Sequence, residues 1–541
     1  MKRKIMRLLA MLLILVLLLT GCDMQVFSDL FEDLYSTIQV GLTTHFEDMT
    51  YVRPDPDGFQ TKLDHCMAEA ETATDADALM TLVFELYELY YDFITNYQLA
   101  NIHYYRDMTD IYWDEEYSFC LEASTDVSAG MDNLLYALAD CPLREELEAE
   151  QYFGADFFDA YEGDSLWDET FTALMAEENA LLDQYYSLNA RQVTDSYYSE
   201  GYFKNYCYPM EEVFVELVKV RQQIAEYAGY DSYPAFAYEF YYYRDYTPEQ
   251  TAEYIEGIRR ELVGLYLDLD PSVWNAMYEN CTEEQMMAYL TKNVEALGGT
   301  AKHAYELMTT AGVYDITYSE NKYDASFEVY LPSYSTPFLF VNPTKSARDK
   351  LTLVHEFGHF CSDYASPGGS QVGIDVAEIF SQSLEYLSLA NEKPYSKLRM
   401  LKLADSLSVY VEQAAYARFE LDVYELEGDD LTVEKVRQVY RQVLADFGLL
   451  AYGRDQRDYV LIPHFFISAE YVISYVVSND VSMQIYCKEL ETPGAGVQIW
   501  QDTLATTQQG ILGYVEEAGL ESPFAEGQIE KIAEFFTIQL P

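Results

Sequence analysis

Residues 352–359 of the chain read TLVHEFGH and place His355 and His359 four positions apart. On an α-helix, residues at positions i and i+4 share one face, so both imidazoles can bind one metal ion. Glu356 lies about 100° around the helix from His355, where its carboxylate can point toward the remaining coordination position. The chain has only seven histidines in 541 residues, which makes this spacing uncommon by chance. The stretch therefore predicts a metal-binding helix.

The residues just before the motif predict where this helix begins. Ser346 and Asp349 resemble a capping box, in which two side chains satisfy the free N–H groups of a first helical turn. Leu351 and Val354 then start an apolar stripe with helical spacing. The motif is therefore expected inside a helix.

Two short runs of β-branched and aromatic residues precede this helix, at 327–330 and 337–341. Pro332 and a polar turn separate them, so they predict a small β-hairpin that leads into the motif helix. A strand edge here could pair with an extended peptide through main-chain hydrogen bonds, and residues 338–341 are the predicted partner. The alternative is a purely structural strand that covers the core.

A catalytic zinc site usually has three protein ligands and leaves a fourth position for water. Glu378 is the predicted third ligand, since it lies nineteen residues after His359 in another segment of helical periodicity. The loop at 365–373 is rich in helix-breaking residues and can reverse the chain between the two segments. This arrangement would bring Glu378 beside the histidines.

Other nearby side chains are rivals for the role of third ligand. We expect Asp375 and Glu385 to orient the histidines rather than to bind the metal. Asp363 follows His359 by one helical turn, and a solvated surface acid is the expectation there. Cys361 would point about 200° away from His359 on the helix, which excludes it as a ligand.

Four segments of the chain resemble, in order and spacing, the oligoendopeptidase F branch of the thimet oligopeptidase family. They lie at residues 334–342, 352–359, 376–385 and 462–466. The resemblance is specific over about residues 320–490 and only architectural elsewhere. It implies zinc ligands at His355, His359 and Glu378, and a catalytic Glu356.

The resemblance also implies a later histidine and tyrosines that stabilise the tetrahedral intermediate. His464 matches that histidine, and Tyr471 and Tyr475 lie in the region where the family has its tyrosines. Phe466 occupies a place where many relatives carry tyrosine. This departure leaves open which hydroxyl stands beside the oxyanion.

These inferences predict a zinc-dependent endopeptidase with one Zn²⁺ per chain. Zinc would lower the pKa of water at its open position to about 7, and Glu356 would take the proton as that water attacks the peptide carbonyl. Glu356 would then return the proton to the leaving amine. The family resemblance implies an enclosed channel, so the predicted substrates are extended peptides of roughly five to fifteen residues.

Two other functions are compatible with parts of the sequence. A related gluzincin carboxypeptidase would need a cation for the substrate carboxylate, and Arg244, Arg348 and Arg454 are the candidates. A non-catalytic peptide-binding lipoprotein is the second alternative, although such proteins usually alternate strands and helices. The complete motif argues against an inactive enzyme.

The first twenty-two residues resemble a bacterial lipoprotein signal. Four basic residues precede an apolar run at 8–19, and the sequence LTGC ends at Cys22. An apolar run of this length is short for a membrane span. We expect a signal peptide at 1–21, acylation of Cys22, and anchoring at the extracytoplasmic face of a bacterial cell membrane. An uncleaved anchor helix is the alternative.

The chain is strongly acidic, with 92 Asp and Glu residues against 33 Lys and Arg residues and a formal net charge of −59. Such a surface repels phosphate groups, which excludes nucleic acid as a partner. It also repels anionic lipid head groups, so the lipid at Cys22 is the only predicted membrane contact. Short oligopeptides remain the predicted partners.

The rest of the sequence predicts mainly helices. Leu, Phe and Tyr recur with helical spacing at 75–107, 127–160, 170–190 and 208–229, and Thr247 and Thr282 begin sequences typical of helix starts. We expect a mainly α, two-lobed fold with a small β-sheet before the zinc-binding helix. A helical N-terminal region at 22–210 is predicted to pack against a catalytic region at 211–541.

Overall fold

The computed structural model describes residues 43–540, apart from residues 150, 162, 164–165, 190, 192–194, 367 and 391. The described part is mainly helical and contains one three-stranded sheet, as the sequence predicted. None of its helices combines the length and the apolar character that crossing a bilayer requires. The predicted signal peptide and Cys22 lie outside the described residues.

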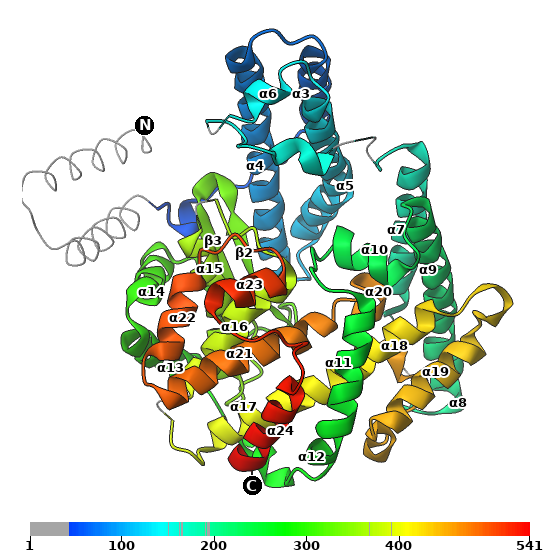
Figure 1. Cartoon of the computed structure of the whole chain (residues 1–541), viewed down its shortest axis with the longest axis vertical. Coiled ribbons are helices and arrows are strands. Elements are labelled where there is room, and N and C mark those ends of the chain that lie inside the picture. The colour runs from blue at the N-terminus through cyan, green and yellow to red at the C-terminus, as the bar shows by residue number, and fades with distance from the viewer. Residues whose placement is uncertain are drawn as a thin grey trace, which may run out of the picture.

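The helices at the top of Figure 1 form a bundle around a hydrophobic core of their own. Three of them begin at an aspartate whose side chain accepts a hydrogen bond from the first turn, namely Asp55, Asp75 and Asp110. The bundle consists of α3 (Pro56–Ala70), α4 (Ala76–Arg106), α5 (Ile111–Ala139) and α6 (Arg144–Leu147).

The helix predicted at 127–160 is displaced in the structure, where α5 begins and ends earlier. Asp110 caps its first turn, so the helix already starts at Ile111. It ends at Ala139, shortly before Pro142, because a proline lacks an N–H and disfavours helical backbone in the residue before it. The helix predicted at 75–107 is confirmed as α4.

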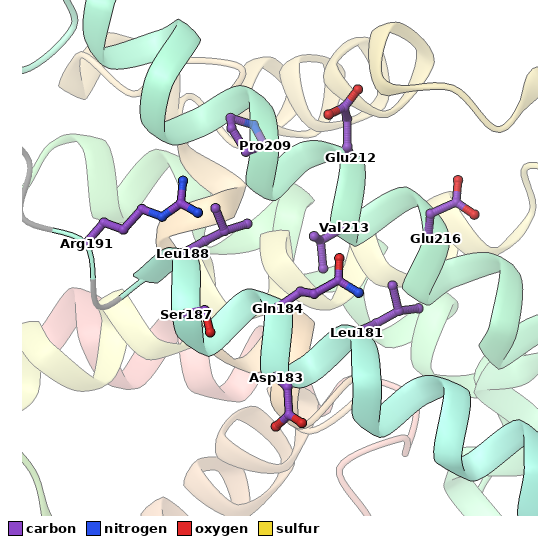
Figure 2. A pocket seen from close by; sticks show the side chains of 10 residues that line it. All are labelled: Leu181, Asp183, Gln184, Ser187, Leu188, Arg191, Pro209, Glu212, Val213 and Glu216. Carbon is purple, nitrogen blue, oxygen red and sulfur yellow. The ribbon is translucent and has the colours of Figure 1, made fainter.

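A second group of helices lies on the right of Figure 1 and shares the main hydrophobic core. Within it, α7 packs along α9, and a groove of about 510 Å³ opens between them (Figure 2). None of the residues that line this groove belongs to the predicted active site. The group consists of α7 (Glu169–Asn189), α8 (Glu200–Tyr202), α9 (Tyr208–Tyr227), α10 (Tyr233–Phe240), α18 (Ala414–Tyr424), α19 (Val433–Asp446) and α20 (His464–Ile467).

The remaining helices include the motif helix and those packed on it. Thr247 and Thr282 form complete capping boxes with Gln250 and Gln285, which confirms the two predicted helix starts. These helices are α11 (Pro248–Glu261), α12 (Val263–Leu267), α13 (Glu283–Leu297), α14 (Gly299–Ala311), α15 (Asp349–Ala365), α16 (Ile374–Ser388), α17 (Lys397–Ser408), α21 (Ile473–Glu491), α22 (Ala495–Thr503), α23 (Ile511–Ala518) and α24 (Gln528–Gln539). The division of the chain near residue 210 stays a prediction.

The sheet has the strand order β1-β3-β2 and precedes the motif helix. Its strands are β1 (Tyr314–Asp315), β2 (Ser326–Leu331) and β3 (Thr336–Val341). The antiparallel pair of β2 and β3 confirms the predicted hairpin. β1 adds in parallel on the other side of β3, where Tyr314 lies opposite Leu339.

This strand order contradicts one prediction about substrate binding. Residues 338–341 belong to the central strand, and β3 is paired with β2 along its whole length. Leu339 and Phe340 are paired with β1 as well. The prediction that an extended peptide pairs with 338–341 is therefore wrong, because these main-chain groups are used within the sheet.

The motif helix α15 packs on the sheet with one face and on α16 with another. Helix α16 lies in turn between α15 and α21, and most of its residues are buried. The predicted capping box at the start of α15 is only half present: the Asp349 side chain accepts the N–H of Ser346, but Ser346 does not cap the helix in return. The packing places the motif deep inside the molecule.

Candidate active site

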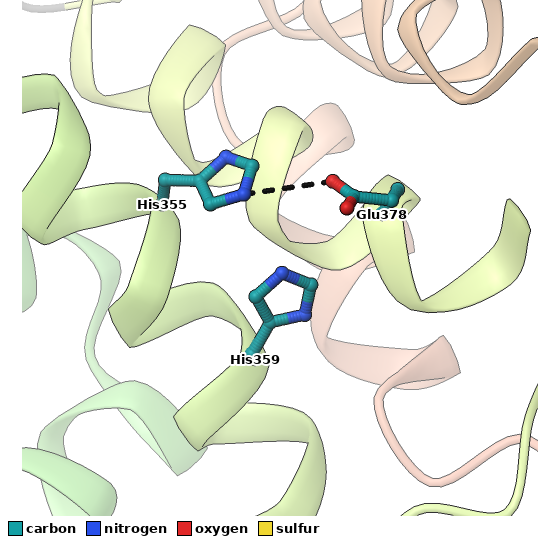
Figure 3. A group of neighbouring side chains, drawn as sticks. All are labelled: His355, His359 and Glu378. Atoms are coloured by element: carbon teal, nitrogen blue, oxygen red, sulfur yellow. Dashed lines mark ion pairs between the residues drawn. The ribbon is translucent and has the colours of Figure 1, made fainter. Parts of the chain in front are cut away.

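Helices α15 and α16 bring the three predicted metal ligands together (Figure 3). His355 and His359 project from the same face of α15, and Glu378 reaches them from α16. One potential ligand atom from each residue lies within 4.8 Å of the others, and His355 Nε2 is 3.5 Å from Glu378 Oε2. The spacing is that of donor atoms grouped around one ion.

Gly358 allows this close approach of the two helices. A β-carbon built on Gly358 would lie 2.5 Å from Ser381 Cα and 2.7 Å from the Phe380 carbonyl oxygen, both on the backbone of α16. A side chain at this position would therefore push α16 away from α15. The glycine within the motif thus has a packing role that brings Glu378 within reach of the histidines.

Glu385 supports His355 from the side opposite the ligand cluster. Its Oε1 lies 2.8 Å from His355 Nδ1, and its Oε2 forms an ion pair with Lys402 Nζ at 2.9 Å. Burial acts to raise the pKa of Glu385, but Lys402 and His355 outweigh burial and lower this pKa to about 2. An ionised carboxylate can only accept, so His355 donates a proton from Nδ1 to Glu385 and turns Nε2 toward Glu378. Burial acts to lower the pKa of His355, but Glu385 and Glu378 outweigh burial and raise this pKa to about 9. Glu385 thus orients a histidine, as predicted.

The donor chemistry of this cluster fits a zinc ion. Two imidazole nitrogens and one carboxylate form a recurrent ligand set of catalytic zinc in peptidases. Burial, together with the nearby His355, lowers the pKa of His359 to about 3, which keeps its imidazole in the neutral, metal-binding form. Ser381 Oγ and Tyr471 OH donate to the two oxygens of Glu378, at 3.2 and 3.1 Å, and so fix this carboxylate.

The other rival carboxylates lie outside the cluster. Asp375 accepts a hydrogen bond from Tyr246 at 2.8 Å and pairs with the buried Arg244, so it does not orient the histidines as predicted. Asp363 accepts the Ser370 N–H at 2.6 Å, and burial raises its pKa to about 6. The expectation of a solvated surface acid at Asp363 is therefore wrong.

Glu356 is buried beside the cluster and is only 6% exposed. Burial raises its pKa to about 7, with Glu378 and Glu385 adding to the rise and His355 opposing it. A carboxyl whose pKa lies near neutrality can both accept and return a proton. The position and the environment of Glu356 fit the predicted general base.

His464, Tyr471 and Tyr475 gather on the opposite wall of the site. The ring of His464 lies 5.5 Å from that of Tyr471 and 5.9 Å from that of Tyr475, and Tyr475 OH is 3.4 Å from His464 Nε2. Burial lowers the pKa of His464, so its imidazole is neutral at physiological pH. Tyr471 reaches Glu378 directly, which places this wall against the ligand cluster.

Phe466, the residue that departs from the family pattern, does not belong to this wall. Its ring is fully buried and stacks on Tyr185 at 4.1 Å, with Phe214 on another side. It therefore packs in the core. Tyr471 and Tyr475 both bring a hydroxyl-bearing ring beside His464.

Two residues that shape the site were not predicted from the sequence. Lys402 and Ser381 fix two of the carboxylates, yet neither lies in the motif. Ser381 follows Glu378 by three positions and could have been read as its neighbour on α16. Lys402 lies on α17, and no local pattern connects it with Glu385.

Comparisons with known proteins agree with this geometry. The family described as peptidase M3 N-terminal domain matches residues 46–165, and peptidase family M3 matches residues 301–506. No curated protein sequence matches the chain.

Solved structures share the fold at low sequence identity. A structure described as oligoendopeptidase F has a TM-score of 0.76 and 20% identity, over 92% of this chain and 98% of that one. A Bacillus anthracis structure described as a putative oligoendopeptidase F has a TM-score of 0.72 and 21% identity, with the same coverage of both chains. The M32 carboxypeptidase from Deinococcus radiodurans is more distant, with a TM-score of 0.51 and 14% identity over 90% of this chain and 98% of that one. The match at residues 301–506 contains the ligand cluster, and the chain belongs to the metallopeptidases of peptidase family M3.

Proposed function

We propose that this metallopeptidase is a zinc-dependent endopeptidase that hydrolyses short peptides. The observation that carries the proposal is the convergence of His355, His359 and Glu378 within 4.8 Å, with Glu356 buried beside them. His355 and His359 would hold the ion through imidazole nitrogens, and Glu378 would hold it through its carboxylate. One ion per chain follows from the single cluster of this kind among the described residues.

The chain's own residues supply the proton transfers. When bound, zinc provides Lewis-acid chemistry, polarising the peptide carbonyl and lowering the pKa of water. Glu356, with a pKa near 7, accepts the proton of the attacking water and returns it to the leaving amine. His464 and Tyr475 would donate hydrogen bonds to the carbonyl oxygen as it gains negative charge, each such donor being worth about 2.7 to 4 kcal/mol.

The pairing of the three candidate arginines favours internal cleavage over carboxypeptidase activity. A carboxypeptidase needs an unpaired cation for the terminal carboxylate, and each of the three candidate arginines already has a carboxylate partner. Arg244 pairs with Asp375 at 3.4 Å and its side chain is fully buried, Arg348 pairs with Asp405, and Arg454 pairs with Glu412 at 2.9 Å. A substrate terminus would have to compete with these carboxylates for any of the three arginines.

Burial of the site supports a preference for short, unfolded substrates. The side chain of Glu378 is 5% exposed and that of His355 is 22% exposed. A peptide bond within a stable folded domain could not reach groups this deep without first unfolding. Short extended chains do not carry this free-energy cost.

Blocked peptides test the proposed activity. A ten-residue peptide with an acetylated N-terminus and an amidated C-terminus should be cleaved internally, at a rate close to that of the unblocked peptide. Mass spectrometry of the products locates the cleaved bond. Loss of cleavage on amidation, together with stepwise release of C-terminal residues from the free peptide, would instead establish a carboxypeptidase.

We also propose that the protein is anchored by lipid at Cys22 on the extracytoplasmic face of a bacterial cell membrane. The support is the sequence of residues 1–22 alone, with its basic start, short apolar run and LTGC ending. Cys22→Ser should leave the protein unacylated, and cell fractionation should then no longer find it as a lipid-modified protein in the membrane fraction. Unchanged labelling by a radioactive fatty acid in this variant would contradict the anchor.

A further inference from the structure

The segment that carries His464 and Tyr471 is held mainly by side chains from other helices. Its helix, α20, has only four residues, so it leaves carbonyl groups without helical partners. Among the described residues, no backbone N–H donates to the carbonyl oxygens of Phe465 or Phe466. Other groups satisfy these two carbonyls.

Arg221 of α9 binds both of them. Its Nη1 donates to the Phe465 carbonyl oxygen at 3.0 Å, and its Nη2 donates to the Phe466 carbonyl oxygen. The planar guanidinium presents its N–H groups as a rigid fork, which suits two neighbouring acceptors. Arg221 therefore fixes the backbone immediately after His464.

Buried partners fix Arg221 in turn. Its Nε donates to Glu178 Oε1 of α7 at 2.7 Å, and its Nη1 also approaches Tyr424 OH at 3.3 Å. The Arg221 side chain is 2% exposed and that of Glu178 is 9% exposed. A buried ion pair of this kind adds little net stability compared with apolar residues of similar size. Its main effect is to fix the position of the Arg221 guanidinium.

Two further contacts hold the rest of the segment. Tyr242 OH donates to the Ala469 carbonyl oxygen at 2.7 Å, and the Glu470 N–H donates to Glu420 Oε1 at 2.8 Å. Glu470 adopts a φ of +67°, a left-handed conformation that a non-glycine residue enters only when its surroundings hold it there. Tyr471, the next residue, donates to Glu378.

We propose that Arg221 and Glu420 are positioning residues for the peptidase reaction. Arg221 holds the α20 turn so that the His464 imidazole faces the substrate carbonyl, and Glu420 holds the Glu470 backbone so that Tyr471 reaches Glu378. The two act through His464 and Tyr471 and do not contact the substrate themselves. This inference rests on the proposed peptidase activity.

A double-mutant cycle tests the role of Arg221. Loss of one oxyanion-stabilising donor lowers kcat by about 10² to 10³-fold, and we expect His464→Ala and Arg221→Met each to fall in this range. KM and zinc content should stay close to those of the wild type. In the His464→Ala background, Arg221→Met should lower kcat by at most about twofold more, since its effect passes through the missing imidazole. Multiplicative losses in the double variant would overturn the proposal.

A matched control separates positioning from loss of stability. Arg437 pairs with the buried Glu211 of the same helix α9, at 2.7 Å, and within the described part of the chain its ion pairs are with Glu211 and Glu434 rather than with residues 464–471. Arg437→Met should lower the unfolding midpoint and leave kcat within about twofold of the wild type. A fall in kcat like that of Arg221→Met would assign both effects to general destabilisation.

Two variants of Glu420, one conservative and one not, test the role of this residue. They remain informative if Arg221→Met does not fold. Glu420→Gln keeps an oxygen that can accept the Glu470 N–H, whereas Glu420→Leu removes it. We expect kcat and zinc affinity to be retained in Glu420→Gln, whereas in Glu420→Leu kcat should fall at least about tenfold and zinc affinity should weaken, because Tyr471 no longer fixes Glu378. Equal kcat values in the two variants would contradict the role of this hydrogen bond.

A spectroscopic measurement makes the positioning testable without turnover. Burial lowers the pKa of His464 in the native protein. If Arg221 holds the imidazole in place, Arg221→Met should let the ring reach water and raise its pKa toward 6.5. NMR titration, with the resonance assigned by its loss in His464→Ala, gives this value. An unchanged pKa would refute positioning by Arg221, and absence of any peptide hydrolysis by the wild type would refute the proposed function separately.

Discussion

Gly358 of the motif helix packs directly against Ser381 of α16: a β-carbon on Gly358 would lie 2.5 Å from Ser381 Cα, where the two backbones leave no space for a side chain. Because Ser381 follows Glu378 by one helical turn, this contact sets the distance between the third predicted ligand and the two histidines. The spacing of the ligand cluster thus depends on a residue that contributes no donor atom.

Gly358→Ala should therefore lower zinc affinity as well as stability. The added methyl group meets backbone, which cannot rotate away, so we expect a loss of about 1 to 3 kcal/mol in the free energy of unfolding. Gly264 is the matched control, since a β-carbon there meets nothing within 4 Å in helix α12. Gly264→Ala should leave zinc affinity unchanged. Competition for zinc with a chelator measures both variants, and equal affinities would contradict the packing role of Gly358.

Glu378, the predicted third ligand, and Glu385, which contacts His355, should respond differently to substitution. Glu378→Ala removes a donor atom, so zinc content after dialysis should fall well below one ion per chain. Glu385→Gln keeps an oxygen near His355 Nδ1 but loses the charge, and we expect an affinity about 10 to 100 times weaker. Zinc retained by Glu378→Ala but lost from Glu385→Gln would reverse the assignment of the two residues.

Local periodicity explains why the ligand cluster could be predicted from the sequence. His355 and His359 are one helical turn apart, and a single loop reverses the chain before Glu378. The predicted hairpin and the capping boxes at Thr247 and Thr282 depend on equally local patterns.

The supporting contacts could not be predicted in this way because they join distant parts of the chain. Arg221 and the Phe465 carbonyl are separated by 244 residues, and only the packing of α9 on α20 brings them together. The order of the sheet was also beyond local patterns, since β1 has two residues and no strand signature of its own. That short strand occupies the second side of β3, which is why the predicted peptide-binding edge was wrong.

The buried carboxyls of Glu420 and Glu470 predict a pH-dependent stability. Burial raises the pKa of Glu420 from its usual 4.5 to about 8, and burial together with Glu420 raises that of Glu470. The native protein therefore keeps protons that the unfolded chain releases above pH 4.5. Its free energy of unfolding should fall as pH rises from 4.5 to 8, by up to about 1.4 kcal/mol per pH unit for each retained proton.

Glu420→Gln should make this decline shallower, because the amide does not titrate. Chemical unfolding at pH 5.5, 6.5 and 7.5 compares the variant with the wild type. Glu516→Gln is a control, since Glu516 lies exposed on α23 (Ile511–Ala518). Parallel curves for Glu420→Gln and the wild type would show that Glu420 is already ionised in the native state.

A folded substrate should be resistant even when its sequence is cleavable. We expect a ten-residue peptide to be hydrolysed, and the same ten residues displayed in a loop of a stable domain to survive, because the domain must open at a cost of about 5 to 15 kcal/mol. Cleavage of the two is followed in one competition reaction by mass spectrometry. Comparable rates would contradict an enclosed site.

The most direct measurement is the comparison of zinc content and peptide turnover in Glu356→Gln. The variant keeps His355, His359 and Glu378, so it should bind about one zinc ion per chain, as the wild type should. It has lost the group that accepts and returns the proton, so hydrolysis of a quenched fluorescent peptide should fall to background. Full zinc occupancy without turnover is the result that the mechanism predicts, and wild-type turnover in the zinc-loaded variant would contradict it.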